Sequence, residues 1–246
     1  MQRIAHAKSI QPYFMQLPIF FEKTITPAAT NYALSEETSK HCVQVLRMQA
    51  GQQMALADGK GTIYTAAILK PDKRSTTVKI LGEEKLPKLQ NHIAIAMSLL
   101  KNASRFEWFL EKAVEIGVSE IIPLISNRTE KQHFRHDRMH SIVVAAMLQS
   151  RQAWLPQLHE PVLFDKMLQN HHHSQKLIAH CEPGAKKTIL EVKAGTDTII
   201  LIGPEGDFTS DEITRATTLG FVPVTLGNTR LRTETAGIVA ATLLAN

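Results

Sequence analysis

Two glycine-rich stretches near the C-terminus hold the residue types best suited to chemistry. Residues 202–208 read Ile-Gly-Pro-Glu-Gly-Asp-Phe, and residues 226–237 read Leu-Gly-Asn-Thr-Arg-Leu-Arg-Thr-Glu-Thr-Ala-Gly. Each follows a short apolar run typical of a buried strand and precedes a helical pattern. Because open α/β sheets form ligand sites at the carboxyl ends of their strands, we expect both stretches to border one small-molecule site.

The first stretch does not have the pattern of a phosphate loop. It lacks the spacing of GxGxxG and the Lys-Ser/Thr pair of a P-loop. Glu205 and Asp207 add carboxylates beside the turn, which favours a neutral or cationic ligand. An ordinary strand-to-helix turn is the alternative interpretation.

The second stretch places Arg232 directly before the helical pattern that begins at Thr233. The positive end of the helix dipole repels a cation and favours an acid such as Glu234. Arg232 therefore needs another reason for its position, such as a substrate, a phosphate or Glu205. The alternative is a local Arg–Glu surface pair, which would contribute little stability.

The elements that must position these stretches fall into two parts. Residues 15–82 contain short alternating strands and one short helix, which predict a small β-barrel, and residues 83–91 read as a polar linker. From residue 92 to residue 246, strand and helix patterns alternate, which predicts a parallel α/β sheet. Residues 1–14 read as a flexible extension with no signal sequence.

Two sequences have the pattern of a helix capping box. Ser104-Arg105-Phe106-Glu107 and Thr209-Ser210-Asp211-Glu212 each place an acid three residues after a hydroxyl side chain. The second of them predicts a defined helix start just after the first glycine-rich stretch.

Composition narrows the function classes. The chain has 246 residues, a net charge of +5, and no apolar run long enough to span a membrane. Cys42 and Cys181 form no CxxC pair, so we expect free thiols in a reducing compartment, with a disulfide as the alternative. His171-His172-His173 reads as an exposed loop, and no ligand spacing predicts a metal site. A basic protein can bind RNA phosphates, although a solvated surface is the safer interpretation of any single cation. The candidate RNA-binding residues are His41, Arg47, Lys73, Arg74 and Arg128.

Several motifs together resemble one known family. Residues 202–206 and the pattern Leu-Gly-x-x-x-Leu-Arg-Thr-Glu-Thr-Ala at 226–236 are similar to the paired C-terminal signature of the bacterial 16S rRNA (uracil-N3) methyltransferases. Residues 41–51 resemble the PUA-like domain of that family, and residues 111–118 resemble its first methyltransferase helix. The resemblance covers nearly the whole chain from about Leu17.

The resemblance implies a PUA-like β-barrel domain followed by a SPOUT methyltransferase domain with a C-terminal trefoil knot. It also implies methyl transfer from S-adenosylmethionine, without a metal, to N3 of a specific uridine, U1498 of the 16S rRNA in this family. A homodimer in the cytoplasm, acting on the small ribosomal subunit, is expected. The implied catalytic residues are Arg232, Glu205 and Glu234. The implied cofactor-binding residues are His180, Ile202, Gly203, Pro204, Glu205, Gly206, Leu226, Gly227, Leu231, Thr235 and Ala236.

The chain departs from the family pattern at three places. Leu148 replaces an acid that is common in the family, Asp207 replaces a frequent glycine, and Asn228 replaces a frequent proline. Three other functions stay open at this point: a SPOUT methyltransferase acting on tRNA, a non-enzymatic RNA-binding protein, and a nucleotide-binding α/β enzyme. The missing phosphate loop weakens the last of these.

Overall fold

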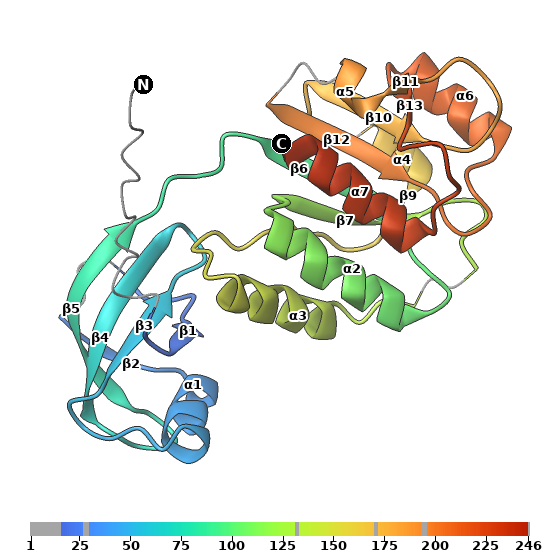
Figure 1. Ribbon diagram of the computed structural model, residues 1–246. Coiled ribbons are helices and arrows are strands. Elements are labelled where there is room, and N and C mark those ends of the chain that lie inside the picture. The colour runs from blue at the N-terminus through green and yellow to red at the C-terminus, as the bar shows by residue number, and fades with distance from the viewer. Residues whose placement is uncertain (1–15, 27–29, 131–132, 170–171, 193–195, 246) are drawn as a thin grey trace, which may run out of the picture. The chain divides into compact units, whose positions relative to one another are not determined.

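The computed structural model describes residues 16–26, 30–130, 133–169, 172–192 and 196–245. The predicted extension 1–14 lies outside these residues. The chain divides into two compact units (Figure 1). The N-terminal unit extends to Pro87 and includes Arg151–Trp154, and the C-terminal unit comprises the rest.

The N-terminal unit is built on a five-stranded sheet. Its order is β1 (Ile19–Phe21), β3 (Gln53–Ala57), β4 (Thr62–Lys70), β5 (Thr77–Lys85) and β2 (Asn31–Ala33). Among the described strands of this sheet, β1 pairs in parallel with β3, and the other pairs are antiparallel. Within the described residues β1 and β2 remain edge strands, so the sheet is a half-barrel, which agrees with the PUA-like β domain that the sequence predicted.

A short helical segment follows β2. Helix α1 (Glu36–Lys40) begins at Ser35, whose hydroxyl accepts a hydrogen bond from the Thr38 backbone N–H, and it continues as a π-helical turn over His41–Val45. The core of this unit joins the sheet to the helical segment. It contains Met54, Leu56 and Tyr64 of the sheet, which are fully buried, and Cys42 of the segment. The apolar side chains of these strands and of the helical segment therefore form one core for the N-terminal unit.

Residues 151–154 return to the N-terminal unit after a helix of the C-terminal unit. Arg151 donates to the Leu17 carbonyl at 2.7 Å, and the Trp154 indole donates to the Leu86 carbonyl at 3.1 Å. Gly61 has a φ of +99°, and a Cβ at this position would lie 2.4 Å from the Trp154 ring. Glycine is the residue that tolerates this positive φ and also leaves room for the Trp154 ring. The Gly61 turn therefore allows residues 151–154 to pack against it.

The boundary between the units differs from the predicted linker. The sequence assigned residues 83–85 to the linker at 83–91, but these residues continue β5, because they pair with Thr62, Ile63 and Tyr64 of β4. The division between the units then falls after Pro87.

The C-terminal unit is a parallel sheet with helices on both faces. The strands run in the order β11 (Lys187–Thr188), β13 (Val222–Thr225), β10 (Gln175–Ala179), β12 (Asp197–Ile202), β6 (His92–Ser98), β7 (Glu120–Ile125) and β8 (Gln157–Leu158), with β9 (Val162–Leu163) also on β7. Among the described residues, the strand pairs of this sheet are all parallel, as the strand and helix alternation predicted. The helices are α2 (Ala103–Ile116), α3 (His136–Gln149), α4 (Phe164–Gln169), α5 (Ile189–Val192), α6 (Ser210–Thr218) and α7 (Thr233–Ala245).

Alternate residues of β6 face opposite layers. Ala94 and Ala96 pack in a cluster with buried side chains of α4 and α6. Met97 points to the other face, where α7 crosses α2: a Cβ on Gly237 would lie 2.6 Å from the Phe109 ring and 3.0 Å from the Met97 sulfur. The continuous apolar run of β6 is thus explained by burial on both faces.

The two predicted capping boxes have different outcomes. The box at Thr209 is confirmed, because Thr209 and Glu212 exchange hydrogen bonds at the start of α6. The box at Ser104 is wrong: the residue that caps α2 is Asn102, two residues earlier, and its side chain accepts from the Ser104 N–H at 2.9 Å. Glu107 is held instead by a bidentate contact with Arg138 of α3.

Two further findings concern the whole of the described chain. Cys42 and Cys181 are free thiols, the first buried and the second exposed. Across the ranges that the structure describes, none of the helices has the length and apolar character that a membrane span requires.

Candidate active site

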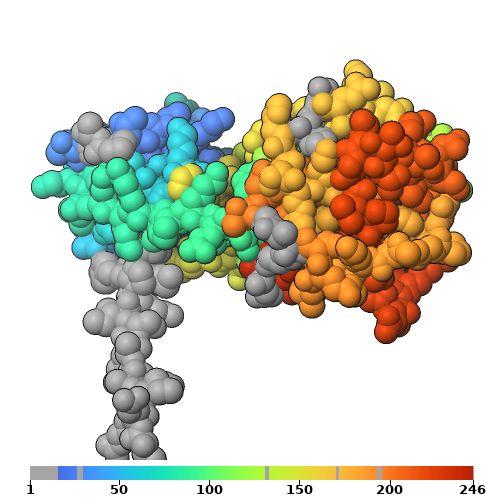
Figure 2. All heavy atoms as spheres, turned by 90° about the horizontal axis from the view of Figure 1, so that it is seen from above, coloured from blue at the N-terminus to red at the C-terminus, as the bar shows by residue number. Residues whose placement is uncertain are grey.

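Three neighbouring parallel strands end at a common cavity. β10 lies between β12 and β13, and Ala179 is in register with both Ile202 and Val224. The loops that follow these three strands therefore begin side by side, and they line a cavity of about 730 Å³. Both glycine-rich stretches therefore reach one site, and the loop after β10, which begins at the expected cofactor residue His180, adds a third wall. In Figure 2, the orange and red atoms of the C-terminal segments cover much of the visible surface of this unit.

Most residues expected to hold a cofactor line this cavity. Apolar walls come from Ile202, Leu226, Leu231 and Ala236, and the remaining expected residues in the lining are His180, Gly203, Pro204, Glu205 and Gly227. Gly206 and Thr235 were also expected and are not among the lining residues. Gly206 faces away, since a Cβ there would meet the Arg128 side chain at 3.3 Å.

The loop after β12 is held by Asp207, which has a positive φ of 63°. Its carboxylate accepts from the Cys181 N–H at 2.7 Å and from its own neighbour, the Phe208 N–H, also at 2.7 Å. The Asp207 N–H donates to the Pro204 carbonyl at 2.9 Å and closes a turn. Aspartate tolerates this left-handed conformation better than most residues, and its carboxylate joins the loop to the end of β10.

Arg128 holds the same loop from outside the cavity. Its guanidinium donates to the Gly206 carbonyl at 2.6 Å and to the Phe208 carbonyl at 3.4 Å. Arg128 was predicted to bind RNA, but its guanidinium is engaged with the backbone of a cavity loop. The contacts give it a positioning role that the sequence did not indicate.

Arg232 lies in the cavity lining just before α7, and its side chain is exposed. Among the described residues, no ion pair to Arg232 is found, so neither the expected contact with Glu205 nor a local pair with Glu234 forms. Glu205 instead accepts from the Lys101 backbone N–H at 3.4 Å. The Arg232 guanidinium is therefore available for a ligand at this electrostatically unfavourable helix end.

Glu234 was predicted to be catalytic, but it is not among the lining residues of the cavity. It is buried in the first turn of α7, where the Arg105 side chain of α2 lies 3.7 Å from one carboxylate oxygen. The other oxygen is buried and has no hydrogen-bond partner among the described residues. Arg105 was missed from the sequence because it is far from both glycine-rich stretches in the chain.

His180, at the end of β10, presents an unsatisfied ring to the cavity. Both ring nitrogens are buried, and neither has a hydrogen-bond partner among the residues that the structure describes. Burial, followed by the positive charge of nearby Lys186, lowers the pKa of His180 below its ordinary value of 6.5. The imidazole is thus neutral at pH 7, with one donor and one acceptor for a ligand.

The other expected RNA-binding residues lie on the surface of the N-terminal unit. His41 and Arg47 flank the π-helical turn, with His41 packed edge-on against Phe20 at 5.6 Å. Lys73 and Arg74 occupy the turn between β4 and β5, where Asp72 accepts from the Arg74 N–H at 2.8 Å. All four side chains are exposed, so the structure leaves them free to meet an RNA surface.

Comparisons with known proteins agree over most of the chain. Residues 87–245 match the family model of an RNA methyltransferase domain, and residues 34–81 match an RNA methyltransferase PUA domain. A relative from Buchnera aphidicola, named ribosomal RNA small subunit methyltransferase E, is 30% identical over 87% of each chain. A relative of the same name from Mesomycoplasma hyopneumoniae is 36% identical over 70% of this chain and 75% of its own.

Solved structures show the same likeness. A probable rRNA-methyltransferase from Porphyromonas gingivalis has a TM-score of 0.84 and 36% identity, covering 92% of this chain and 95% of its own. A putative methyltransferase from Legionella pneumophila, solved with bound S-adenosylmethionine, has a TM-score of 0.84 and 30% identity, covering 93% and 96%. The sequence motifs, the two-unit fold and these matches agree, and the chain belongs to the ribosomal RNA small subunit methyltransferase E family of RNA methyltransferases.

Proposed function

We propose that this protein transfers a methyl group from S-adenosylmethionine to N3 of a specific uridine in the 16S rRNA of the small ribosomal subunit. The observation that carries the proposal is the cavity at the ends of β10, β12 and β13, which is bordered by both glycine-rich stretches. Relatives named for small-subunit rRNA methylation, and neighbours bound to S-adenosylmethionine, support it.

The cavity residues fit S-adenosylmethionine. The His180 ring nitrogens are buried and have no partner among the described residues, which is costly unless a ligand satisfies them. Ile202, Leu226 and Leu231 provide apolar walls for an adenine ring. Gly227 has a φ of +146° and open space where a Cβ would lie, so its backbone can follow a ligand closely. Asp207 adds a carboxylate that suits a cationic sulfonium.

The bound donor supplies an electrophilic methyl group, whose bond to sulfur breaks as its bond to the uracil nitrogen forms. Arg232 is positioned to stabilise the negative charge that develops on a uracil oxygen when the N3 proton leaves. Glu205 is the candidate proton acceptor, because it lines the cavity, is exposed, and is not held by Arg232. Glu234 does not line the cavity, and its role is to hold the Arg105 side chain in an ion pair.

The N-terminal unit would supply RNA affinity. His41, Arg47, Lys73 and Arg74 are exposed and polar, and three of them carry a fixed positive charge suited to phosphate contacts. Replacing Arg47 with alanine should reduce the slope of log affinity against log salt by about 1, measured by filter binding at graded salt.

We further propose a homodimer with a knotted C-terminal domain, located in the cytoplasm. These properties follow from the family resemblance and from a role on ribosomal RNA. Sedimentation equilibrium of the full chain would test the dimer: a single species of 27.4 kDa at micromolar concentration would contradict it.

The central test compares Arg232→Ala with the wild-type enzyme on purified small subunits that lack the modification. Loss of the Arg232 guanidinium, which would stabilise the negative charge on the uracil oxygen, should lower the turnover number about 10²–10³-fold. Primer extension reads the product, because a methyl group on N3 blocks base pairing. Arg215→Ala is the matched control, since Arg215 pairs with Asp165 on the surface and should leave turnover unchanged.

The outcomes separate the competing functions. Near-normal turnover in Arg232→Ala with an unchanged melting temperature would refute the role of Arg232. Methylation of tRNA and not of small subunits would assign the chain to a different RNA substrate. Failure of the wild-type protein to bind S-adenosylmethionine in calorimetry would favour a non-enzymatic RNA-binding protein.

A further inference from the structure

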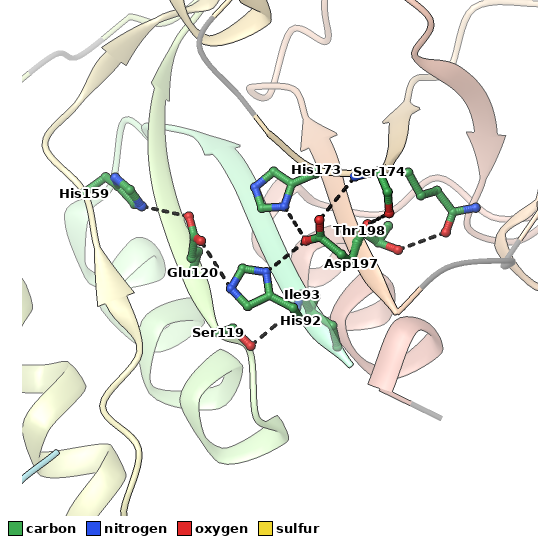
Figure 3. A network of polar contacts seen from close by, with 10 residues as sticks. His92, Ile93, Ser119, Glu120, His159, His173, Ser174, Asp197 and Thr198 are labelled. Carbon is green, nitrogen blue, oxygen red and sulfur yellow. Dashed lines mark hydrogen bonds and ion pairs between the residues drawn. The ribbon is translucent and has the colours of Figure 1, made fainter. Parts of the chain in front are cut away.

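A second cluster of polar side chains lies where the strands of the C-terminal sheet begin, at the end opposite the candidate active site (Figure 3). His92 begins β6 and Asp197 begins β12, and the two residues are paired in register across adjacent strands. His173 comes from the segment just before β10. These are the amino ends of the strands, whereas the candidate active site lies at the carboxyl ends, about 20 Å away along a strand of seven residues.

Two imidazoles converge on a single carboxylate oxygen in this cluster. Asp197 Oδ1 lies 3.0 Å from His92 Nδ1 and 2.8 Å from His173 Nδ1. The two rings are nearly parallel, with centroids 5.6 Å apart. The Ser174 N–H donates to the second oxygen, Asp197 Oδ2, at 3.2 Å and fixes the carboxylate. The potential ligand atoms of the three side chains all lie within 4.8 Å of one another.

These distances suit a small metal ion. Zn²⁺ binds imidazole nitrogen and carboxylate oxygen at about 2.0–2.2 Å, so the ligand atoms of a tetrahedral site lie about 3.4 Å apart. The two imidazole nitrogens would each need to move only a few tenths of an ångström away from Asp197 Oδ1 to reach this separation. His173 is the most enclosed of the three, with 9% of its side chain exposed.

An outer carboxylate orients one of the imidazoles. His92 Nε2 lies 3.2 Å from Glu120 Oε1, and Glu120 Oε2 lies 2.9 Å from His159 Nε2. A neutral imidazole has one N–H, yet both nitrogens of His92 face carboxylate oxygens. If Nε2 donates to Glu120, Nδ1 is left with a lone pair beside Asp197, which is the arrangement of a metal-bound histidine with a carboxylate behind it.

The surroundings favour a cation. The cluster opens on a cavity of about 860 Å³, whose described charged lining residues are Glu120, Glu160 and Asp197 against one lysine, Lys88. His172 also lines this cavity, and His171 lies outside the described residues. The sequence predicted an exposed His171–His173 loop and no metal site, but His173 is enclosed and has partners on two distant strands.

We propose that His92, His173 and Asp197 bind one divalent transition-metal ion, with Zn²⁺ as the ion that best fits two imidazoles and a carboxylate. The fourth position opens to the cavity, and Glu120 is a positioning residue for His92. Because its ligands come from β6, β12 and the segment before β10, the ion would tie together the amino ends of three elements. Its distance from the candidate active site makes it a structural ion rather than a catalytic one.

The test uses the full chain without an affinity tag, treated with chelator and then titrated with Zn²⁺ by calorimetry and with Co²⁺ by visible absorption. We expect one ion per chain, with a dissociation constant below about 10 µM, and Co²⁺ bands typical of a four-coordinate N/O site. His92→Ala and Asp197→Asn should each weaken binding at least tenfold. Glu120→Gln should weaken it about 10–100-fold without removing a ligand.

His172→Ala is the matched control, because it shortens the histidine run but removes none of the three ligands. Binding that survives His92→Ala and is lost in His172→Ala would show that the histidine run binds the ion, and the proposal would be wrong. Absence of binding to the wild-type chain would show that the cluster is a network of hydrogen bonds alone. The melting temperature of each metal-free variant establishes that it is folded, and Asp197→Asn and Glu120→Gln keep the proposal testable if His92→Ala does not fold.

Discussion

Substitutions of Asp207 should separate backbone conformation from hydrogen bonding in a loop of the candidate active site. The residue has a φ of +63°, and its carboxylate accepts two backbone N–H groups at 2.7 Å, from Cys181 and Phe208. Asp207→Gly keeps the conformation but loses both acceptors. Asp207→Ala loses both acceptors and places a Cβ in the left-handed region. Asp207→Asn keeps one carbonyl acceptor in a side chain that tolerates the conformation.

The magnitudes follow from these contacts. A hydrogen bond to a charged group contributes about 1.5–3 kcal/mol, and partial exposure of this loop reduces that to about 1 kcal/mol each. Asp207→Gly should therefore destabilise the loop by about 2 kcal/mol and Asp207→Asn by about 1 kcal/mol. Asp207→Ala should cost about 1–2 kcal/mol more than Asp207→Gly because of the left-handed backbone.

Two measurements on the same variants read these differences. Denaturant unfolding gives the free energy of unfolding, and calorimetry with S-adenosylmethionine gives the affinity of the cavity. The expected order is wild type, then Asn, Gly and Ala, with Ala binding about fivefold or more weakly than Gly. If Ala equals or exceeds Gly in both measurements, the left-handed conformation imposes no cost, and the reasoning about this loop is wrong.

Three further predictions concern packing and pH. Gly237→Ala should lower the free energy of unfolding by about 1–2 kcal/mol, measured in thermal or denaturant melts. The clash of the new methyl group with the Phe109 ring outweighs the better helix propensity of alanine. An unchanged free energy of unfolding would mean that α7 and α2 can separate freely. The hydrogen bond from Arg138 lowers the pKa of Glu107, so the pair stabilises the fold above pH 4.5 and loses this effect as the pH falls through the lowered value. Glu107→Gln should therefore cost less than about 1 kcal/mol at pH 7 and nothing at strongly acid pH, and an equal cost at both would argue against an ionic contribution. S-adenosylmethionine should bind equally well at pH 7 and pH 8 and more weakly as the pH falls through the lowered pKa of His180, where an imidazolium would face the sulfonium. An affinity that stays constant while NMR shows the His180 imidazole becoming protonated would remove His180 from the binding surface.

Local patterns in the chain predicted the elements that surround the active site. Apolar runs predicted β6, β10, β12 and β13, because strands buried on both faces leave little room for polar residues. Thr209 and Glu212 predicted the start of α6, because a capping box depends only on residues three apart. The same rule failed at Ser104, where Asn102 competes successfully for the helix start and Glu107 is drawn to another helix.

Contacts between distant segments decided what these patterns left open. The resemblance named Arg232 and Glu205 together, and both line the cavity, but no ion pair joins them among the described residues, and Glu205 accepts from the Lys101 backbone N–H. Asp207 was noted as a departure from a frequent glycine, and the structure shows how an aspartate adopts that left-handed turn and uses its carboxylate to hold it.

The sequence by itself determined the order and type of most elements, the two glycine-rich loops and the family, because each depends on residues close together in the chain. The tertiary structure decided which loops share a cavity, since strand order inserts β10 between β12 and β13. It also decided the partners of Glu234 and the meeting of His92, His173 and Asp197, three side chains from separate segments. No local pattern encodes such contacts, because they arise only when the sheet aligns the ends of strands that are far apart in the chain.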